Sequence, residues 1–130
     1  MTEIRDPLTH EIIGAAIEVH RELGPGILES AYEECFSFEL ATRKLSVKRQ
    51  VSLPIIYKGH KIEVGYRPDL IVEDQVIVEL KCVEKLIPVY DAQLLTYLRL
   101  SGIERGLLIN WFSHPLMNGI KRLVRTRPAP

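Results

Sequence analysis

The chain is poor in cysteine, because only Cys35 and Cys82 occur among its 130 residues. Two cysteines so far apart give neither the disulfide framework of a small secreted domain nor the paired spacing of a zinc site. Both fall among apolar residues, so we expect two buried thiols in a reducing compartment. The sequence therefore predicts a cytoplasmic location.

Long apolar stretches are also missing. No run approaches the roughly 20 residues that a transmembrane helix needs, and residues 1–6 lack the apolar core of a signal peptide. No internal repeat, low-complexity segment or linker divides the chain. We therefore expect no membrane partner and a single domain over residues 1–130, whose 46% apolar content is enough for a buried core.

An excess of one charge is absent as well, since 17 basic and 17 acidic side chains give a formal net charge of zero. The charges are nevertheless segregated along the chain. Residues 1–40 carry nine acidic and two basic side chains, residues 43–67 seven basic and one acidic, and residues 105–130 five basic and no acidic. This asymmetry permits a basic groove on a neutral protein, although each cluster could equally be an ordinary solvated face.

The spacing of apolar residues predicts two helices, then strands, a third helix and further strands. Apolar side chains recur every three or four positions over residues 8–23, and Gly24 can end this first helix. The same reasoning predicts a helix over 28–44, strands over 47–57, 61–66 and 68–72, a strand beginning at 76, a helix over 88–100, a strand over 106–110, and a short strand or helix over 119–125.

One predicted strand contains charges that its apolar composition does not explain. Val76, Ile77 and Val78 begin a run apolar enough to be covered on both faces, yet Glu79 and Lys81 fall inside it. Because side chains alternate along a strand, these two share a face with Ile77. A buried charge is costly unless it is paired, hydrogen-bonded or bound to a metal. Alternatively, the lysine extends its ammonium to solvent at the strand end.

The preceding strand brings a second carboxylate to the same place. Glu73, Asp74 and Gln75 form the predicted turn, and a three-residue loop places Asp69 opposite Glu79. Opposed β-carbons lie about 4.5 to 5.5 Å apart, so the two carboxylates would meet and repel unless a divalent cation lay between them. A two-residue loop would send Asp69 to the other face, so the site depends on this register.

The third predicted helix adds Gln93 and Tyr97, which lie four residues apart and therefore on the same side. One interpretation is a half-buried tyrosine beside a solvated glutamine. The other, favoured by the charged hairpin, is an amide and a phenol that orient a phosphate, a nucleotide or the lysine.

In the order and spacing of these motifs the chain resembles the GxxExxY proteins, which are grouped with the PD-(D/E)xK nuclease superfamily. Gly26, Glu29 and Tyr32 match the Gly-x-x-Glu-x-x-Tyr motif for which those proteins are named. The resemblance covers about residues 8–125. It includes Arg67-Pro68-Asp69, Glu79-Leu80-Lys81 and the Gln93-x-x-x-Tyr97 pair, which is similar to a helix motif of RecB-type nucleases.

The resemblance implies an α/β (α+β) fold of the restriction-endonuclease-like type. In that arrangement a mixed β-sheet is flanked by helices, and two N-terminal helices precede a hairpin-rich sheet and a crossover helix. It further implies a metal-dependent nuclease that hydrolyses phosphodiester bonds of nucleic acid, with DNA favoured over RNA. The catalytic residues it implies are Glu29, Asp69, Glu79, Lys81, Gln93 and Tyr97.

The same resemblance implies Mg²⁺ or Mn²⁺ held by Glu29, Asp69, Glu79 and the backbone carbonyl of Leu80. Lys81 would position or deprotonate the attacking water, or stabilise charge on the phosphate.

Three further side chains each keep more than one interpretation. His20 is either an extra metal ligand, as in some RecB-type nucleases, or a histidine capped or solvated near a helix end. Tyr32 packs in the core, donates a hydrogen bond to Glu29, or does both. Glu33 either supports the ligands or lies on a solvated helix face.

The alternative to an active nuclease is a nuclease-fold protein with weak or lost chemistry that binds nucleic acid or another protein. The intact Glu29, Asp69, Glu79 and Lys81 argue against lost chemistry. A homodimer is also open, because small nucleases often need one to cut two strands. Fold alone does not decide among these functions.

Overall fold

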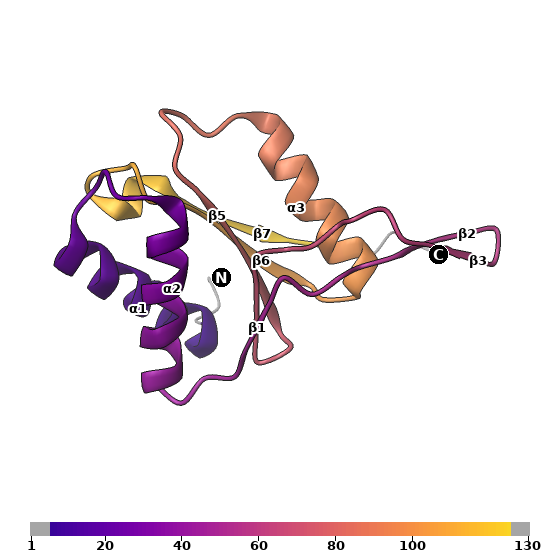
Figure 1. Cartoon of the computed structure of the whole chain (residues 1–130), viewed down its shortest axis with the longest axis horizontal. Coiled ribbons are helices and arrows are strands. Elements are labelled where there is room, and N and C mark those ends of the chain that lie inside the picture. The colour runs from indigo at the N-terminus through magenta and orange to yellow at the C-terminus, as the bar shows by residue number, and fades with distance from the viewer. Residues whose placement is uncertain (1–5, 126–130) are drawn as a thin grey trace.

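The protein is built as a mixed β-sheet between two helical layers (Figure 1). The computed structural model describes residues 6–125. Within this range, none of the helices has the length and apolarity required to cross a membrane. The elements in chain order are α1 (Pro7–Leu23), α2 (Glu29–Thr42), β1 (Val47–Arg49), β2 (Ile55–Tyr57), β3 (His60–Ile62), β4 (Leu70–Val72), β5 (Val76–Lys81), α3 (Pro88–Ser101), β6 (Arg105–Asn110), the short 3-10 helix η1 (Leu116–Gly119) and β7 (Ile120–Val124).

The main sheet has the strand order β1-β4-β5-β6-β7, with β5 at its centre. The β5–β6 pair is parallel and the other three pairs are antiparallel. Parallel neighbours need a crossover, and α3 supplies it between β5 and β6. The predicted mixed sheet, with two N-terminal helices and a crossover helix, is confirmed, and residues 120–124 form a strand rather than a helix.

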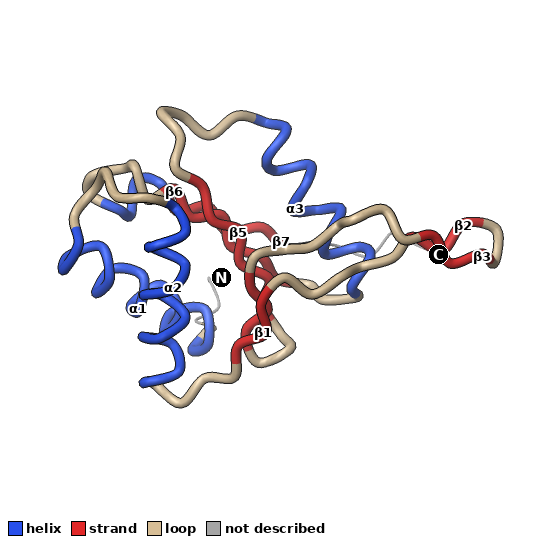
Figure 2. Tube along the Cα trace, in the orientation of Figure 1, coloured by secondary structure: helices blue, strands red, loops and turns tan. Residues whose placement is uncertain are grey.

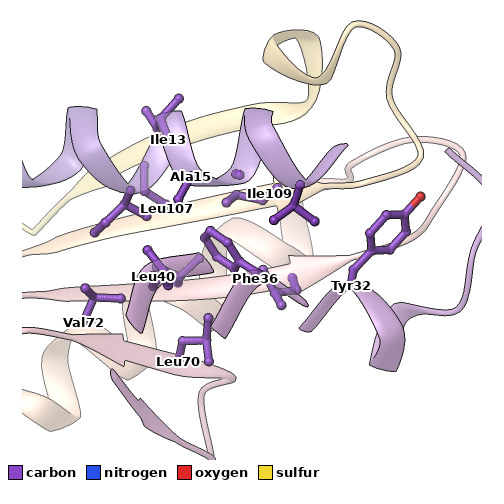
Figure 3. Packing of buried hydrophobic residues seen from close by; sticks show 14 of the residues in the cluster. Ile13, Ala15, Tyr32, Phe36, Leu40, Leu70, Val72, Leu107 and Ile109 are labelled. Carbon is purple, nitrogen blue, oxygen red and sulfur yellow. The ribbon is translucent and has the colours of Figure 1, made fainter. Parts of the chain in front are cut away.

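Helices α1 and α2 cover one face of the sheet. Figure 3 shows Phe36 and Leu40 of α2 close to Leu70 and Val72 of β4 in this core. Trp111, just after β6, is fully buried and stacks on another core ring, that of Tyr32, with centroids 4.7 Å apart. This layer fixes the start of α2 relative to the sheet.

Helix α3 covers the opposite face. Leu94, Tyr97 and Leu98 pack with Ile71 of β4 and Ile77 of β5. The other buried apolar side chains of β5, at positions 76, 78 and 80, belong to the α1–α2 core. The prediction that this strand is covered on both faces is therefore confirmed, and Glu79 and Lys81 alternate onto the α3 side.

The predicted single strand over 47–57 is wrong, because the chain forms two strands there. Strand β1 pairs with β4, whereas β2 pairs with β3 in a separate two-stranded hairpin. Gln50 has a φ of 52°, outside the extended region, and Pro54 cannot donate to a ladder, so the strand is interrupted between β1 and β2. Figure 2 shows the long loops that lead to this hairpin and back. Strand β3 is correspondingly shorter than the predicted 61–66.

The prediction of two buried thiols is wrong for Cys35, which is exposed, while Cys82 is partly buried. Helix α2 buries Tyr32, Phe36 and Leu40, a stripe with a spacing of four residues. Cys35 lies outside this stripe on the helix, so its side chain is exposed although apolar residues stand near it in the sequence.

Gly106 in β6 allows α3 to lie close to the sheet. A β-carbon at this position would be 3.0 Å from one methyl carbon of Leu94 and 3.1 Å from two more carbons of that side chain. Leu94 is fully buried, so it has little room to move. The distance of α3 from the sheet, and therefore the position of Tyr97, depends on the absence of a β-carbon at Gly106.

We expect Gly106→Val to lower the free energy of unfolding by about 1 to 3 kcal/mol, because the new methyl groups collide with Leu94. Urea denaturation measures the loss. Leu94→Ala serves as the matched partner, since it is destabilising alone but makes room for the introduced valine in the double variant. Strictly additive losses in the double variant would contradict the proposed collision.

Candidate active site

The β4–β5 hairpin has the register that the site requires. Residues 70–72 pair with 78–76 in antiparallel order, so the turn contains Glu73, Asp74 and Gln75. Glu73 and Asp74 each have a φ of 54°, which makes the tight reversal possible. The predicted three-residue loop is confirmed, and Asp69 lies opposite Glu79.

The two carboxylates are held by the backbone of the hairpin. The Asp69 N–H donates to Glu79 Oε1 over 2.7 Å, and the Leu80 N–H donates to Asp69 Oδ2 over 2.8 Å. Each acidic side chain therefore accepts a hydrogen bond from the strand opposite its own. This reciprocal arrangement fixes both carboxylates more firmly than side-chain packing alone would.

Gln50, which the sequence analysis did not select, also contacts this pair. Its backbone N–H donates to the Asp69 carbonyl over 3.2 Å, and its side-chain Nε2 donates to Asp69 Oδ1 over 3.3 Å. No sequence signal pointed to this contact, because residue 50 was placed inside a continuous strand. The left-handed backbone at Gln50 ends β1 beside the site.

Burial makes the negative charge of Glu79 costly. Glu79 is 5% exposed, and desolvation, followed by the charge of Asp69, raises its pKa to about 8. The Asp69 N–H and the Lys81 ammonium oppose the shift. Without a cation, the pair therefore retains a proton near neutral pH.

Glu29 approaches the pair from the first turn of α2. Its side chain is largely exposed, yet partial desolvation and then the charge of Asp69 raise its pKa, while Lys81 opposes this change. Over residues 6–125, no three His, Cys, Asp or Glu side chains form a group arranged to hold a metal. The structure thus brings Asp69 and Glu79 into contact and places Glu29 within electrostatic range, outside that contact.

The chemistry of the contacting pair fits a hard divalent cation. Both residues present carboxylate oxygens, the ligands that Mg²⁺ and Mn²⁺ prefer. A cation between them would compensate the repulsion that contributes to the raised pKa of Glu79.

Lys81 lies over an aromatic ring on the α3 side of the sheet. Its Nζ is 4.5 Å from the centroid of Tyr90, in the first turn of α3. This cation–π contact holds the ammonium near the helix rather than in open solvent. Tyr90 is a second residue that the sequence analysis missed, since an aromatic residue early in a helix resembles an ordinary core position.

Gln93 and Tyr97 form the predicted pair on one side of α3. Gln93 Nε2 donates to the Tyr97 hydroxyl over 3.2 Å, so the glutamine is not merely solvated. Tyr97 is buried, and desolvation, then the charges of Glu79 and Asp69, raise its pKa. The phenol therefore lies on the same side of the sheet as the two carboxylates.

His20 is a core residue rather than a solvated one. Its Nε2 lies 3.0 Å from the Trp111 carbonyl, and its ring stacks with those of Tyr32 and Trp111. A carbonyl can only accept, so Nε2 carries the proton and donates it. Metal ligation by His20 would have to use Nδ1.

The Gly-x-x-Glu-x-x-Tyr motif has a structural explanation. Gly26 has a φ of 99°, which favours glycine in the turn before α2. Tyr32 donates to the Gly24 carbonyl, and the Ile27 N–H donates to the Tyr32 hydroxyl over 3.5 Å. The tyrosine therefore ties down the loop before Glu29 instead of donating to its carboxylate.

Glu33, one turn after Glu29, forms an ion pair with Arg49 of β1 over 3.1 Å. Its negative charge also contributes to the raised pKa of Glu29. Glu33 therefore links α2 to the edge strand β1. It is not freely solvated, and it does not take part in the Asp69–Glu79 contact.

A restriction-endonuclease-like fold with paired carboxylates on a hairpin, followed by a lysine two residues later, defines a protein of the nuclease class. The chain belongs to the PD-(D/E)XK nuclease superfamily, whose sequence model matches residues 6–123.

The chain is similar to two solved structures. The alkaline exonuclease LHK-Exo from Laribacter hongkongensis is 16% identical, with a TM-score of 0.51 over 97% of this chain and 73% of that chain. LHK-Exo in complex with dAMP is also 16% identical, with a TM-score of 0.46 over 85% and 76%. The first comparison supports the fold alone at this identity. No curated protein matches the chain.

We expect the metal-free protein to lose stability as the pH rises from about 5 to 8. The folded-state pKa of Glu79 is raised, so the unfolded chain releases this proton first and the free energy of unfolding falls until the folded pKa is passed. The loss is on the order of a few kcal/mol. Thermal unfolding in EDTA across this pH range measures it.

The matched variants are Glu79→Gln, which cannot ionise, and Glu84→Gln, which changes an exposed glutamate in the following loop. Glu79→Gln should flatten the pH dependence, whereas Glu84→Gln should retain it. Equal slopes for native protein and Glu79→Gln would show that Glu79 is not the responsible group.

Proposed function

We propose that the protein is a metal-dependent nuclease that hydrolyses phosphodiester bonds of nucleic acid, with DNA favoured over RNA. The observation that carries the proposal is the contact between Asp69 and Glu79, with Lys81 on the same face of β5. Membership of the nuclease superfamily supports the reaction class. The exposed Cys35 thiol suits a reducing compartment, so the proposal includes a cytoplasmic location.

Asp69, Glu79 and the backbone carbonyl of Leu80 would hold Mg²⁺ or Mn²⁺, with Glu29 completing the set directly or through water. A bound cation supplies an activated water and neutralises charge on the phosphate oxygens. The reciprocal hydrogen bonds keep Asp69 and Glu79 in place, so little side-chain freedom is lost when they bind.

Lys81 and the α3 residues act on the phosphate. As water forms its bond to phosphorus and the bond to the leaving oxygen breaks, the Lys81 ammonium stabilises the added negative charge. A neutral Lys81 amine would instead accept the proton that the water loses. Tyr97, backed by Gln93, lies on the α3 side and can orient the phosphate by hydrogen bonding.

We expect native protein to cleave nucleic acid in Mg²⁺ or Mn²⁺, and Asp69→Ala and Lys81→Ala to lose about 100-fold or more of the rate. The assay compares plasmid, linear duplex, single-stranded DNA and RNA, which also tests the preference for DNA. Lys85→Ala, at an exposed lysine in the next loop, is the matched control and should retain activity. Cleavage that persists in both Asp69→Ala and Lys81→Ala would overturn this site.

A binding protein with weak chemistry is the second candidate. The observation that favours it is that Glu29 does not join Asp69 and Glu79 in a three-ligand group in the described part of the chain. Metal-independent binding with a steep salt dependence, without cleavage under any of these conditions, would favour this alternative.

A further inference from the structure

The hairpin of β2 and β3 projects from the body of the protein as an arm (Figure 1). We define the arm as residues 51–67. Several of its large apolar side chains are exposed, and Tyr57 near the tip is 57% exposed. An isolated two-stranded hairpin is marginally stable in water. The exposed apolar surface therefore indicates that the arm is a binding surface.

One face of the arm is apolar and aromatic. Ile55 pairs with Ile62 and Tyr57 with His60, so alternation places these four side chains on the same face. The opposite face carries Lys61, which forms an ion pair with Glu63 over 3.6 Å. The opposite face also carries Ile56, which is 64% exposed, but the aromatic side chain lies on the Tyr57 face. The Tyr57 face is therefore the one that can stack on an aromatic partner.

The base of the arm is attached to the candidate active site. Gln50, immediately before the arm, donates to Asp69. Inside the arm, the Leu53 N–H donates to the Tyr66 carbonyl over 2.8 Å, and the Tyr66 ring lies edge-on to Tyr97 with centroids 6.2 Å apart. A ligand on the arm would therefore have a fixed direction relative to Asp69 and Tyr97.

The charge of the arm suits a polyanion. It carries Lys58, Lys61 and Arg67 against a single acidic residue, Glu63. Lys58 lies over the Tyr57 ring, 5.4 Å from its centroid, and among the described residues neither Lys58 nor Arg67 forms an ion pair with a carboxylate. On the other side of the site, Glu29 at the start of α2 is exposed and acidic, so cations on the arm would offset its repulsion of a phosphate chain.

We propose that the arm binds an unpaired stretch of the nucleic-acid strand that enters the candidate active site, with Tyr57 stacking on a base and Lys58 and Arg67 contacting phosphates. This assignment rests on the proposed nuclease function. Aromatic side chains between cations form a sequence-tolerant platform for unpaired bases, because every base has a π face. The apolar side chains beside Tyr57 suit bases better than they suit a duplex backbone.

A second copy of the chain is a weaker explanation for the exposed face. Specific protein interfaces use about 20 to 30 residues on each side, whereas the Tyr57 face presents only a few side chains. One or two stacked bases need no more surface than that.

The distance from the site sets the length of substrate that can reach the arm. Tyr57 lies seven positions after Gln50 in the chain, which corresponds to at most about 25 Å of extended backbone. Stacked nucleotides advance about 3.4 Å each, so a strand of about seven nucleotides is long enough to contact Tyr57 and the scissile position together. A small phosphodiester would occupy the site without touching the arm.

The first test is fluorescence anisotropy with a labelled 12-nucleotide single strand and its duplex, in EDTA to prevent turnover. We expect Tyr57→Ala to weaken single-strand binding about 10-fold or more, and Tyr57→Phe, which keeps the ring, to bind nearly as native protein does. Lys58→Ala should lower the salt slope by about 0.7. Circular dichroism verifies that each variant is folded.

Matched controls are available on α2 and after it. Phe38→Ala removes another exposed aromatic side chain, 73% exposed, and Lys44→Ala removes another lysine with a positive φ, 63° against 50° for Lys58. Both controls should bind as native protein does. Equal binding by native protein and Tyr57→Ala would overturn the proposal.

A second readout separates the arm from the chemistry. Tyr57→Ala should raise KM for the 12-nucleotide strand and leave hydrolysis of bis(p-nitrophenyl) phosphate unchanged. Tyr57-dependent binding without cleavage by native protein would support the arm and refute the nuclease. Cleavage by native protein, with the same KM for native protein and Tyr57→Ala, would support the nuclease and refute the arm. A dimer that Tyr57→Ala converts to monomer, with nucleic-acid binding unchanged, would assign the arm to a second copy and overturn the proposal.

Discussion

The two hydrogen bonds that hold the carboxylates of Asp69 and Glu79, from the Leu80 N–H and the Asp69 N–H, are the constraint on which the rest of the site depends. A buried carboxylate, that of Glu79, meets the partly buried carboxylate of Asp69 where their repulsion is screened less than in water, and each is fixed by an N–H of the facing strand. Burial of β5 between two helical layers makes this contact costly for the metal-free protein. The same burial would strengthen the binding of the proposed cation, because the attraction between opposite charges is also poorly screened there.

The two helical layers place different groups around this contact. From the α1–α2 layer comes Glu29, whose position depends on the loop that Tyr32 ties to Gly24. From the α3 layer come Tyr90 and Tyr97, whose distance from the sheet depends on Gly106. Because the candidate site takes residues from both layers, the sheet must hold the two layers in a fixed relative position. The parallel pairing of β5 with β6, the strands that α3 connects, contributes to this.

The chain after Lys81 is fixed in a similar way. Asn110, buried at the end of β6, accepts from the Val83 N–H over 3.1 Å and donates to the Val83 carbonyl over 2.8 Å. A side-chain amide thus continues the pairing beyond the last strand residue and directs the loop toward α3. The arm on the other side of Asp69 is anchored by Gln50 and Tyr66, so both segments that flank the carboxylate pair are restrained.

The sequence by itself determined the three long helices and the β4–β5 hairpin, because alternation, helical spacing and a short turn act between near neighbours in the chain. Given a three-residue turn, it also determined the meeting of Asp69 with Glu79. It also determined that Gln93 and Tyr97 share one side of a helix. Only the tertiary structure decided that Lys81 lies over Tyr90, that Gln50 reaches Asp69, that His20 bonds Trp111, and that Cys35 is exposed. These contacts join residues of different elements, and their geometry follows from how helices pack on the sheet, which local patterns do not specify.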